Sequence, residues 1–475
     1  MSGHDEVVIG LDAGTTSSKL VTVERSGAIV TRAESDPIPT SAPEPGASVQ
    51  DASAIWQALA TACRRGTEGL PAATTVRAVA AAAQSGSVIA VGDHAEPVAI
   101  TWMDTRSRPL VDSWDEPTPE TVRAVSGWAP SPGLGLSTIS WLRTQTDTPP
   151  TTRWASVDDY LIHELTGSWL TNPSNAAGMQ LMNVSLLEWS SELCDIAGID
   201  QSTLAGIVSS GEKCGVLTSA AAGATGLAES TPVVIGGHDQ ACAALGLGVT
   251  APGSASLSMG TAWVVTLVID QAKTGTIPRG FNLSPHVVPG RWSVSQNLGG
   301  LGAALASSLA DTDIDATELE RRLGSQATGD DDGFFIPSIR DPERTGWGEF
   351  TPSTVQDPMA RARAVMEACA FETRRAIEEV APVVRLRELT AIGGGTRSGY
   401  LTQLIADVAG VPLTVRPQES WPALGAAMLA ASACGWAART DPNLPITTLH
   451  PRASADATIE WRYVEYRRLT TGERR

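Results

Sequence analysis

Residues 10–19, Gly-Leu-Asp-Ala-Gly-Thr-Thr-Ser-Ser-Lys, place a carboxylate beside a turn rich in small hydroxyl side chains. Glycine lets backbone amides approach an anion, and serine and threonine hydroxyls add donors, so the pattern is typical of a phosphate-binding turn. Asp12 can then hold a hydrated Mg²⁺ against the same phosphates. The run lacks the GxxxxGK[ST] pattern of a P-loop, and a hairpin turn with a local Asx bond at Asp12 stays open. The candidate phosphate ligands are Gly14, Thr15, Thr16 and Ser17.

A second carboxylate, Asp239, follows a short apolar run at 232–235 and two glycines, and it precedes a run of small residues. This pattern predicts a buried strand that leads into a helix, with Asp239 at the helix N-terminus, where α/β proteins place ligands. A carboxylate there can accept a proton from a hydroxyl nucleophile. The alternative is an N-cap aspartate, which is the commonest role at such a position. We interpret the neighbouring His238 as a packing or supporting residue.

Residues 101–106 carry Trp102, Asp104 and Arg106 at alternating positions, with Gln84 upstream. If this segment is extended, the alternating side chains point the same way. An aromatic ring, a carboxylate and a guanidinium on one face would grip a polyhydroxylated ligand. The alternative is an exposed loop that contains a local Asp–Arg pair.

Two further turns are candidates for nucleotide contacts. Gly260-Thr261 lies between two β-type runs and resembles the first turn, so the two turns could grip one polyphosphate from both sides. Gly394 and Gly395, in a glycine triplet that precedes Ser398, expose backbone where a nucleotide's base and sugar would fit. Plain tight turns are the alternative for both segments.

The elements that must position these residues alternate between strands and helices, which predicts an α/β architecture. Apolar runs at 7–11 and 20–23 flank the first turn, and runs at 255–259 and 263–269 flank Gly260. Gly14 and Gly260 are 246 residues apart, about half the chain, so we interpret the chain as a duplication with a linker at 246–254 and a cleft between the halves. Predicted helices span 54–63, 358–380 and 400–409, and further predicted strands span 75–82, 88–91, 231–235 and 386–392.

Composition limits the function classes. The chain of 475 residues has a net charge of −18, which disfavours nucleic acid and anionic membranes as partners. The apolar stretch 421–438 is mostly alanine with Pro422, so we expect a buried helix rather than a membrane span. Six scattered cysteines and an N-terminus without an apolar signal core indicate a reduced, cytoplasmic protein.

Together, these motifs resemble the FGGY carbohydrate kinase family of the actin-like ATPase superfamily. Residues 12–17 look like its first phosphate loop, 237–239 like its Gly-x-Asp segment, and 260–261 like its second phosphate loop. Residues 393–412 look like its adenosine segment, and 341–345 resemble its Gly-Glu-Arg segment with Pro342 in place of glycine. Each motif is short, but their order and spacing along nearly the whole chain are specific together.

The resemblance implies two ribonuclease H-like domains, at 1–248 and 249–475, with ATP and substrate bound between them. It implies that Asp239 is the catalytic base, that Asp12 and Asp239 hold Mg²⁺, and that Gly302 joins the nucleotide-binding residues. Gln84, Trp102, Asp104 and Arg106 would hold a small sugar or polyol, with Asp239 beside them. Related kinases suggest a homodimer.

The sequence departs from the family pattern at two of these places. The pentulose-kinase subgroup carries Gln-Met-His-Gly where this chain has Gln84-Ser85-Gly86-Ser87, so a substrate-contacting histidine is absent. Ala262 replaces a serine after the second phosphate loop. A non-catalytic sugar or nucleotide sensor on the same fold, and an actin-like ATPase, are the alternative functions.

Overall fold

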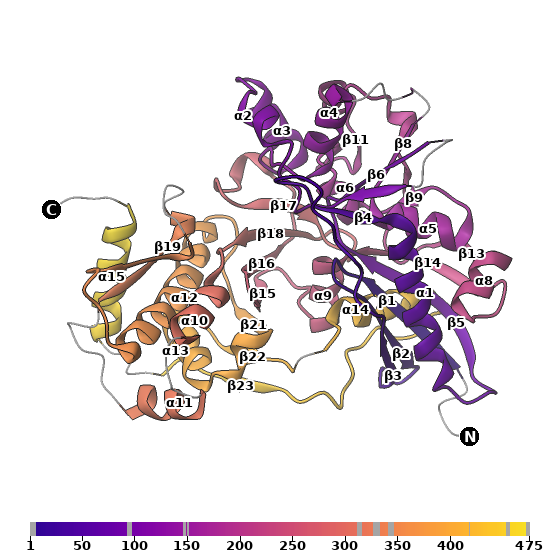
Figure 1. The fold of residues 1–475 in the computed structure, drawn as a ribbon. Helices are drawn as coiled ribbons and strands as arrows, with labels where there is room; N and C mark the ends of the chain where they lie inside the picture. Colours follow the sequence, from indigo (N-terminus) through magenta and orange to yellow (C-terminus); the bar gives the residue numbers. More distant parts are fainter. Residues whose placement is uncertain are drawn as a thin grey trace.

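The computed structural model describes residues 6–92, 97–145, 149, 152–310, 316–325, 333–340, 346–417, 419–452 and 457–471. The chain forms two α/β halves, each built around its own mixed sheet, with the indigo-to-magenta half beside the orange-to-yellow half (Figure 1). The expected α/β architecture is therefore confirmed. The segment 341–345, which resembles the Gly-Glu-Arg segment, lies outside the described residues.

The N-terminal sheet has six strands in the order β13-β14-β5-β1-β2-β3. Its centre is the predicted hairpin, in which β1 pairs antiparallel with β2, while β1 and β14 both run parallel to β5. Apart from Glu6 at its start, β1 is completely buried, as a central strand requires. The strands span Glu6–Ala13 (β1), Ser18–Glu24 (β2), Ile29–Glu34 (β3), Thr75–Ala83 (β5), Lys213–Val216 (β13) and Pro232–His238 (β14).

The C-terminal sheet has seven strands in the order β17-β18-β16-β15-β21-β22-β23 and repeats the same motif. Here β15 pairs antiparallel with β16 and parallel with β21, as β1 does with β2 and β5. The predicted second hairpin is thereby confirmed. The strands span Ser254–Met259 (β15), Trp263–Ile269 (β16), Asn282–Pro285 (β17), Trp292–Asn297 (β18), Glu388–Ile392 (β21), Leu413–Val415 (β22) and Thr447–Leu449 (β23).

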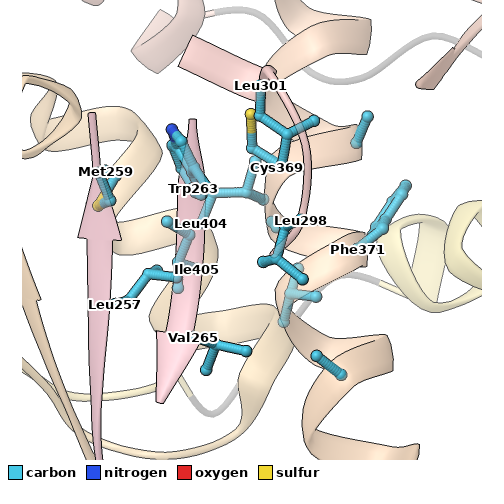
Figure 2. Packing of buried hydrophobic residues seen from close by; sticks show 14 of the residues in the cluster. Leu257, Met259, Trp263, Val265, Leu298, Leu301, Cys369, Phe371, Leu404 and Ile405 are labelled. Atoms are coloured by element: carbon cyan, nitrogen blue, oxygen red, sulfur yellow. The ribbon is translucent and has the colours of Figure 1, made fainter. Parts of the chain in front are cut away.

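Helices cover both sheets at or close to the predicted places. The 23-residue α12 begins after the N-cap Asp357, whose carboxylate accepts a hydrogen bond from the Ala360 amide. Figure 2 shows Cys369 and Phe371 of this helix and Leu404 of α13 packed around Trp263 and its strand in the C-terminal core. The principal helices span Ala52–Glu68 (α1), Val157–Thr166 (α5), Asp239–Leu247 (α9), Leu301–Ala310 (α10), Pro358–Val380 (α12) and Gly399–Ala409 (α13).

One helix crosses between the halves. α14 (Trp421–Ala433) comes from the C-terminal half but packs on β1, β5 and α9 of the N-terminal half (Figure 1). Its alanines share a buried cluster with Val8 and Val21, because small side chains allow the helix to lie close to the sheet. The expectation of a buried helix is confirmed. The domain boundary at 248/249 stays a prediction. Helix α14 departs from it, because α14 follows the boundary in sequence but packs on the N-terminal half.

A small sheet in the N-terminal half has the strand order β4-β7-β6-β8. Its strands span Val49–Asp51 (β4), Val98–Ile100 (β7), Val88–Val91 (β6) and Arg153–Ala155 (β8). The helical loops that follow reach the other half: Trp128 Nε1 donates to Leu283 O at 3.1 Å, and Leu283 N donates to Gly127 O at 3.0 Å. These contacts attach the edge strand β17 to the N-terminal half. All six cysteines are free. In the described parts of the chain, no helix has the length and apolarity that a membrane crossing needs.

Candidate active site

A cavity of about 250 Å³ lies between the two halves, beyond the carboxyl ends of the N-terminal strands. Because β1, β5 and β14 are parallel neighbours, the residues that end or follow them meet at one edge of the sheet. Asp12 lies opposite Ala82 in β5, and Gln84 N donates to Ala13 O at 3.0 Å. Of the residues predicted from sequence, the structure brings Thr15, Gln84, Trp102 and Asp239 into the lining of this cavity.

Asp239 begins α9 and borders the cavity with 29% of its side chain exposed. Its Oδ1 accepts a hydrogen bond from Gln240 N at 2.6 Å and lies 3.0 Å from His238 Nε2. Within the described residues, Oδ2 has no hydrogen-bond partner. The N-cap of α9 is His238, so the alternative interpretation of Asp239 as an N-cap is wrong. One oxygen of Asp239 anchors the carboxylate at the helix start, while the other stays available to a ligand.

A second cavity, of about 240 Å³, borders Asp239 as well. It lies between α9, the β15–β16 hairpin and the start of α14, and Gln240 and Val264 belong to both cavities. Asp239 can therefore meet ligands that enter from two directions, which an aspartate that acts between two substrates requires.

Asp12 is almost fully buried, and no described residue forms a hydrogen bond with its Oδ1. Its Oδ2 lies 3.5 Å from Ser420 Oγ, at the limit of a hydrogen bond. Burial, and after it the negative charge of Asp239, raise the pKa of Asp12 to about 7. A cation between these two carboxylates would remove the cost of holding both charges.

This donor set fits Mg²⁺. Among the described residues, no three His, Cys, Asp or Glu side chains form a cluster that could enclose a metal ion. Mg²⁺ is usually bound through one or two carboxylates together with substrate phosphates and water, so a closed protein cage is not needed. Asp12 and Asp239 supply those two carboxylates.

A ring of hydrogen bonds holds the aromatic wall of the cavity. Trp102 donates from Nε1 to Thr15 Oγ1 at 3.2 Å and from its backbone to Ser87 Oγ at 3.1 Å. Both hydroxyls then donate to Gln84 Oε1, at 3.0 Å and 3.2 Å. Gln84 Nε2 is buried at the cavity wall and has no hydrogen-bond partner within the described parts of the chain. Thr15 therefore lines the cavity and supports Gln84, and its phosphate role stays a prediction.

The prediction that Asp104 and Arg106 face the ligand together with Trp102 is wrong. The segment is not extended, because Asp104 N donates to Thr101 O and closes a turn. The Asp104 carboxylate is buried, where it accepts from Ser48 N at 2.9 Å and pairs with Arg106 at 2.8 Å. The alternative interpretation, a loop with a local Asp–Arg pair, describes this segment.

The other residues of the first turn lie around Thr15. The exposed Thr16 accepts from Ile38 N through its carbonyl oxygen, at 2.7 Å. Ser17 Oγ donates to Glu34 at 2.6 Å. Gly14 is partly exposed at the end of β1. None of these three residues lines the cavity, so a phosphate role for them stays a prediction.

The predicted nucleotide residues gather at the corresponding edge of the C-terminal sheet. Because β15 and β21 are parallel, Gly260 and the glycine triplet that follow them come together, and a side chain at Gly395 would contact Met259. Gly302 lies at the start of α10, where a Cβ would come within 1.9 Å of Gly260 O, so only glycine fits. Thr261 is exposed in the same turn.

Ser398 differs from this expectation. Its hydroxyl caps α13 by accepting from Leu401 N at 3.0 Å, and it donates to Glu320. The Ser398 hydroxyl, a predicted nucleotide contact, therefore forms its hydrogen bonds within the protein. The structure gives Ser398 a helix-capping role.

Several cavity residues were not found from the sequence. Trp128, Gln240, Asn282, Ser295 and Asn297 all line the cavity, and the last three come from the C-terminal sheet. Gln240 follows Asp239 and could have been noted for that reason. The others follow no motif, because their place depends on how β17 and β18 dock against the N-terminal half.

A buried chain of hydrogen bonds positions the start of α9. Asp158 Oδ2 accepts from Asn172 Nδ2 at 2.9 Å, and Asn172 Oδ1 accepts from Ser174 Oγ at 2.6 Å. Ser174 Oγ in turn accepts from His238 N at 2.9 Å. The chain thus connects α5 to the residue directly before Asp239.

We expect Asp158→Asn to flatten the pH dependence of folding stability. Burial, and next the charge of Asp159, raise the pKa of Asp158 from 3.8 to about 7. Between these values the folded chain holds a proton that the unfolded chain has lost, so this group's contribution to stability falls as pH rises. Chemical denaturation at pH 4.5 and 7 should show that the free energy of unfolding falls less in the variant than in wild type, by up to about 3 kcal/mol.

The exposed Asp195, in α7 (Ser191–Ala197), provides the matched control. Asp195→Asn should keep the pH dependence of wild type. Equal pH dependence in the Asp158 and Asp195 variants would contradict the assignment of a protonated, buried Asp158.

Comparison with known proteins decides the family. The FGGY family of carbohydrate kinases has an N-terminal domain model that matches residues 7–246 and a C-terminal domain model that matches residues 263–434. The chain belongs to the FGGY family of carbohydrate kinases. This FGGY kinase therefore has the two-domain fold and the phosphotransferase activity that the sequence motifs predicted, and kinases of this family use ATP.

Three relatives illustrate the spread of names within the family. The kinase is 27% identical over 485 residues to a xylulose kinase from Escherichia coli, covering 97% of this chain and 98% of the relative. It is 27% identical to a glycerol kinase from Thermococcus onnurineus, covering 90% and 89% of the two chains. The structure of a gluconate kinase from Lactobacillus acidophilus superposes with a TM-score of 0.89, 21% identity and 98% coverage of both chains.

Proposed function

We propose that this kinase transfers the terminal phosphoryl group of ATP to one hydroxyl of a small sugar or polyol bound in the 250 Å³ cavity. The observation that carries the proposal is the state of Asp239: one oxygen is anchored at the start of α9, and the other has no partner among the described residues that surround the cavity. Gln84 and Trp102 lie in the same lining and would bind the acceptor's other hydroxyls and its C–H face.

Asp239 acts as the general base in this proposal. Its Oδ2 accepts the proton of the acceptor hydroxyl while the hydroxyl oxygen bonds to the terminal phosphorus and the bond from that phosphorus to the leaving ADP oxygen breaks. General-base assistance of this kind contributes about 10²- to 10⁴-fold to a rate. Most of the remaining acceleration comes from alignment of the two substrates and from stabilisation of charge on the transferred group.

Asp12 and Asp239 would hold Mg²⁺, which when bound neutralises charge on the phosphates. The turns at 14–17 and 260–261, with Gly302, Gly394 and Gly395, would receive the nucleotide. The partly exposed glycines, and the exposed Thr16 and Thr261, at matching edges of the two sheets support this assignment. Closure of the halves would exclude water and limit ATP hydrolysis.

ADP release in the presence and absence of acceptors tests the proposal. The panel contains glycerol, tetritols, pentitols, pentuloses and hexuloses, each with MgATP. We expect at least one of them to raise ADP release about 100-fold or more above the rate with ATP alone. ADP release that no acceptor changes would indicate an ATPase, and no ADP release at all would indicate a sugar or nucleotide sensor.

A further inference from the structure

Among the described residues that line the acceptor cavity, there is no lysine or arginine to neutralise a negatively charged substrate. The basic side chain in this lining is His238, whose Nε2 lies 3.0 Å from Asp239 Oδ1. Arg106, from the neighbouring segment, is paired with Asp104 and Glu44. Asp239 lies in the lining, and Asp12 is close enough for the two carboxylates to repel each other. In the described lining, the carboxylate of Asp239 is therefore balanced by no lysine or arginine, and the imidazole of His238 is already directed at it.

Uncharged polar groups take the place of cations. Four carboxamides line the cavity: Gln84, Gln240, Asn282 and Asn297. Each carboxamide carries two donors and an acceptor, which matches hydroxyl groups that both donate and accept. Asn297 uses its Oδ1 to accept from Gly299 N at 2.8 Å, which leaves its amide nitrogen for a ligand. Such a site favours ligands that carry hydroxyl groups. A ligand without hydroxyl groups would leave the carboxamides of the site without hydrogen-bond partners.

Aromatic and apolar groups complete the wall and set its size. The rings of Trp102 and Trp128 line the cavity, as does Leu134. A Cβ at Gly86 would lie 2.5 Å from Leu134 Cδ2, so this leucine fills the space that a larger side chain would need. Cavities that enclose drug-sized ligands measure about 300–1,000 Å³, so the smaller volume here fits one sugar unit.

The carboxamide at Asn282 reaches the site from the opposite half of the chain. It begins β17 and pairs with Ser295 of β18, which also lines the cavity. The following Leu283 is attached to the N-terminal half through Trp128 and Gly127. This attachment ties the strand that carries Asn282 to the N-terminal half at the cavity.

We propose that the acceptor is an uncharged polyol or ketose of one sugar unit, and that Asn282 contacts its hydroxyls at the end away from Asp239. Aldonates and sugar phosphates are rejected, because their negative charge would meet the carboxylate of Asp239 in a described lining that holds no lysine or arginine. This inference rests on the proposed kinase function and narrows its substrate class.

Matched acceptor pairs test the inference. Purified kinase is assayed with MgATP and one acceptor at a time, and ADP release gives kcat/KM for each acceptor. The acceptors are erythritol and erythronate, ribitol and ribonate, xylitol and xylonate, and the ketose of each carbon number. We expect the better neutral member to exceed the aldonate of the same length by at least about 100-fold. An aldonate used as well as its neutral partner overturns the inference while the kinase function stands. No acceptor-dependent ADP in any pair overturns both.

A charge added at Asn282 tests the assigned contact. Asn282→Lys should shift the ratio of aldonate to alditol kcat/KM by at least about tenfold towards the aldonate. Asn443→Lys, in an exposed loop after α14, adds the same charge and should leave the ratio unchanged. Circular dichroism confirms that both variants fold. Equal ratios of aldonate to alditol kcat/KM in the two variants overturn the role of Asn282. If Asn282→Lys fails to fold, Asn282→Asp takes its place and should shift the ratio further against the aldonate.

Discussion

Asp239→Asn is expected to lower kcat by about 10³-fold or more, with ATP affinity kept within about threefold of wild type. The amide has the shape of the carboxylate and keeps an oxygen that accepts from Gln240 N, so the start of α9 stays intact. What it loses is the oxygen that accepts the proton of the acceptor hydroxyl. Steady-state kinetics with the best acceptor, together with calorimetric titration of ATP, measures both quantities.

The control for this variant is Asp270→Asn. Asp270 is an exposed aspartate beyond β16, at the end of the strand opposite to the Gly260–Thr261 turn. It should leave kcat and ATP affinity unchanged. Near-normal turnover of Asp239→Asn would refute the assignment of Asp239 as general base.

Asp12→Asn has the second large expected effect, a loss of at least about 100-fold in kcat at saturating Mg²⁺, with a weaker apparent Mg²⁺ affinity. In wild type, Mg²⁺ prefers the ionised carboxylate, whose pKa is raised to about 7. Apparent Mg²⁺ affinity should therefore increase as pH rises to about 7 and then level off. The variant has no ionisable group at this position and should lack this increase. Mg²⁺ titrations of activity between pH 6 and 8 measure both effects.

A measurement of folding stability distinguishes this loss of activity from unfolding of the Asp12→Asn variant. The folded-state pKa of Asp12 lies above its unfolded value of about 3.9, so its ionisation above pH 7 opposes folding. Asp12→Asn removes that cost and should be as stable as wild type, or more stable, at pH 8. Unchanged Mg²⁺ dependence in a folded variant would contradict the role of Asp12.

The sequence predicted most local structure because the strands and helices have strong patterns of their own. The hairpins around Gly14 and Gly260 and the span of α12 are confirmed. Asp12 and Asp239 are neighbours for a topological reason: parallel strands place their carboxyl ends at one edge, and both residues follow apolar strand patterns.

Features that depend on long-range packing could not be predicted in the same way. Alternation at Trp102 and Asp104 suggested one face, but a tight turn reverses the chain there. The alanine-rich α14 was recognised as buried, although which sheet it covers is decided by tertiary contacts. Asn282 and Asn297 enter the site only because the C-terminal sheet docks on Trp128.

The most direct measurement is a crystal structure of the kinase with Mg²⁺, a non-hydrolysable ATP analogue and the accepted polyol. The account predicts that Asp239 Oδ2 lies within hydrogen-bond distance of the one acceptor hydroxyl that is aligned with the terminal phosphorus. A closed complex in which both carboxylate oxygens bond to the start of α9, and another group contacts that hydroxyl, would contradict it.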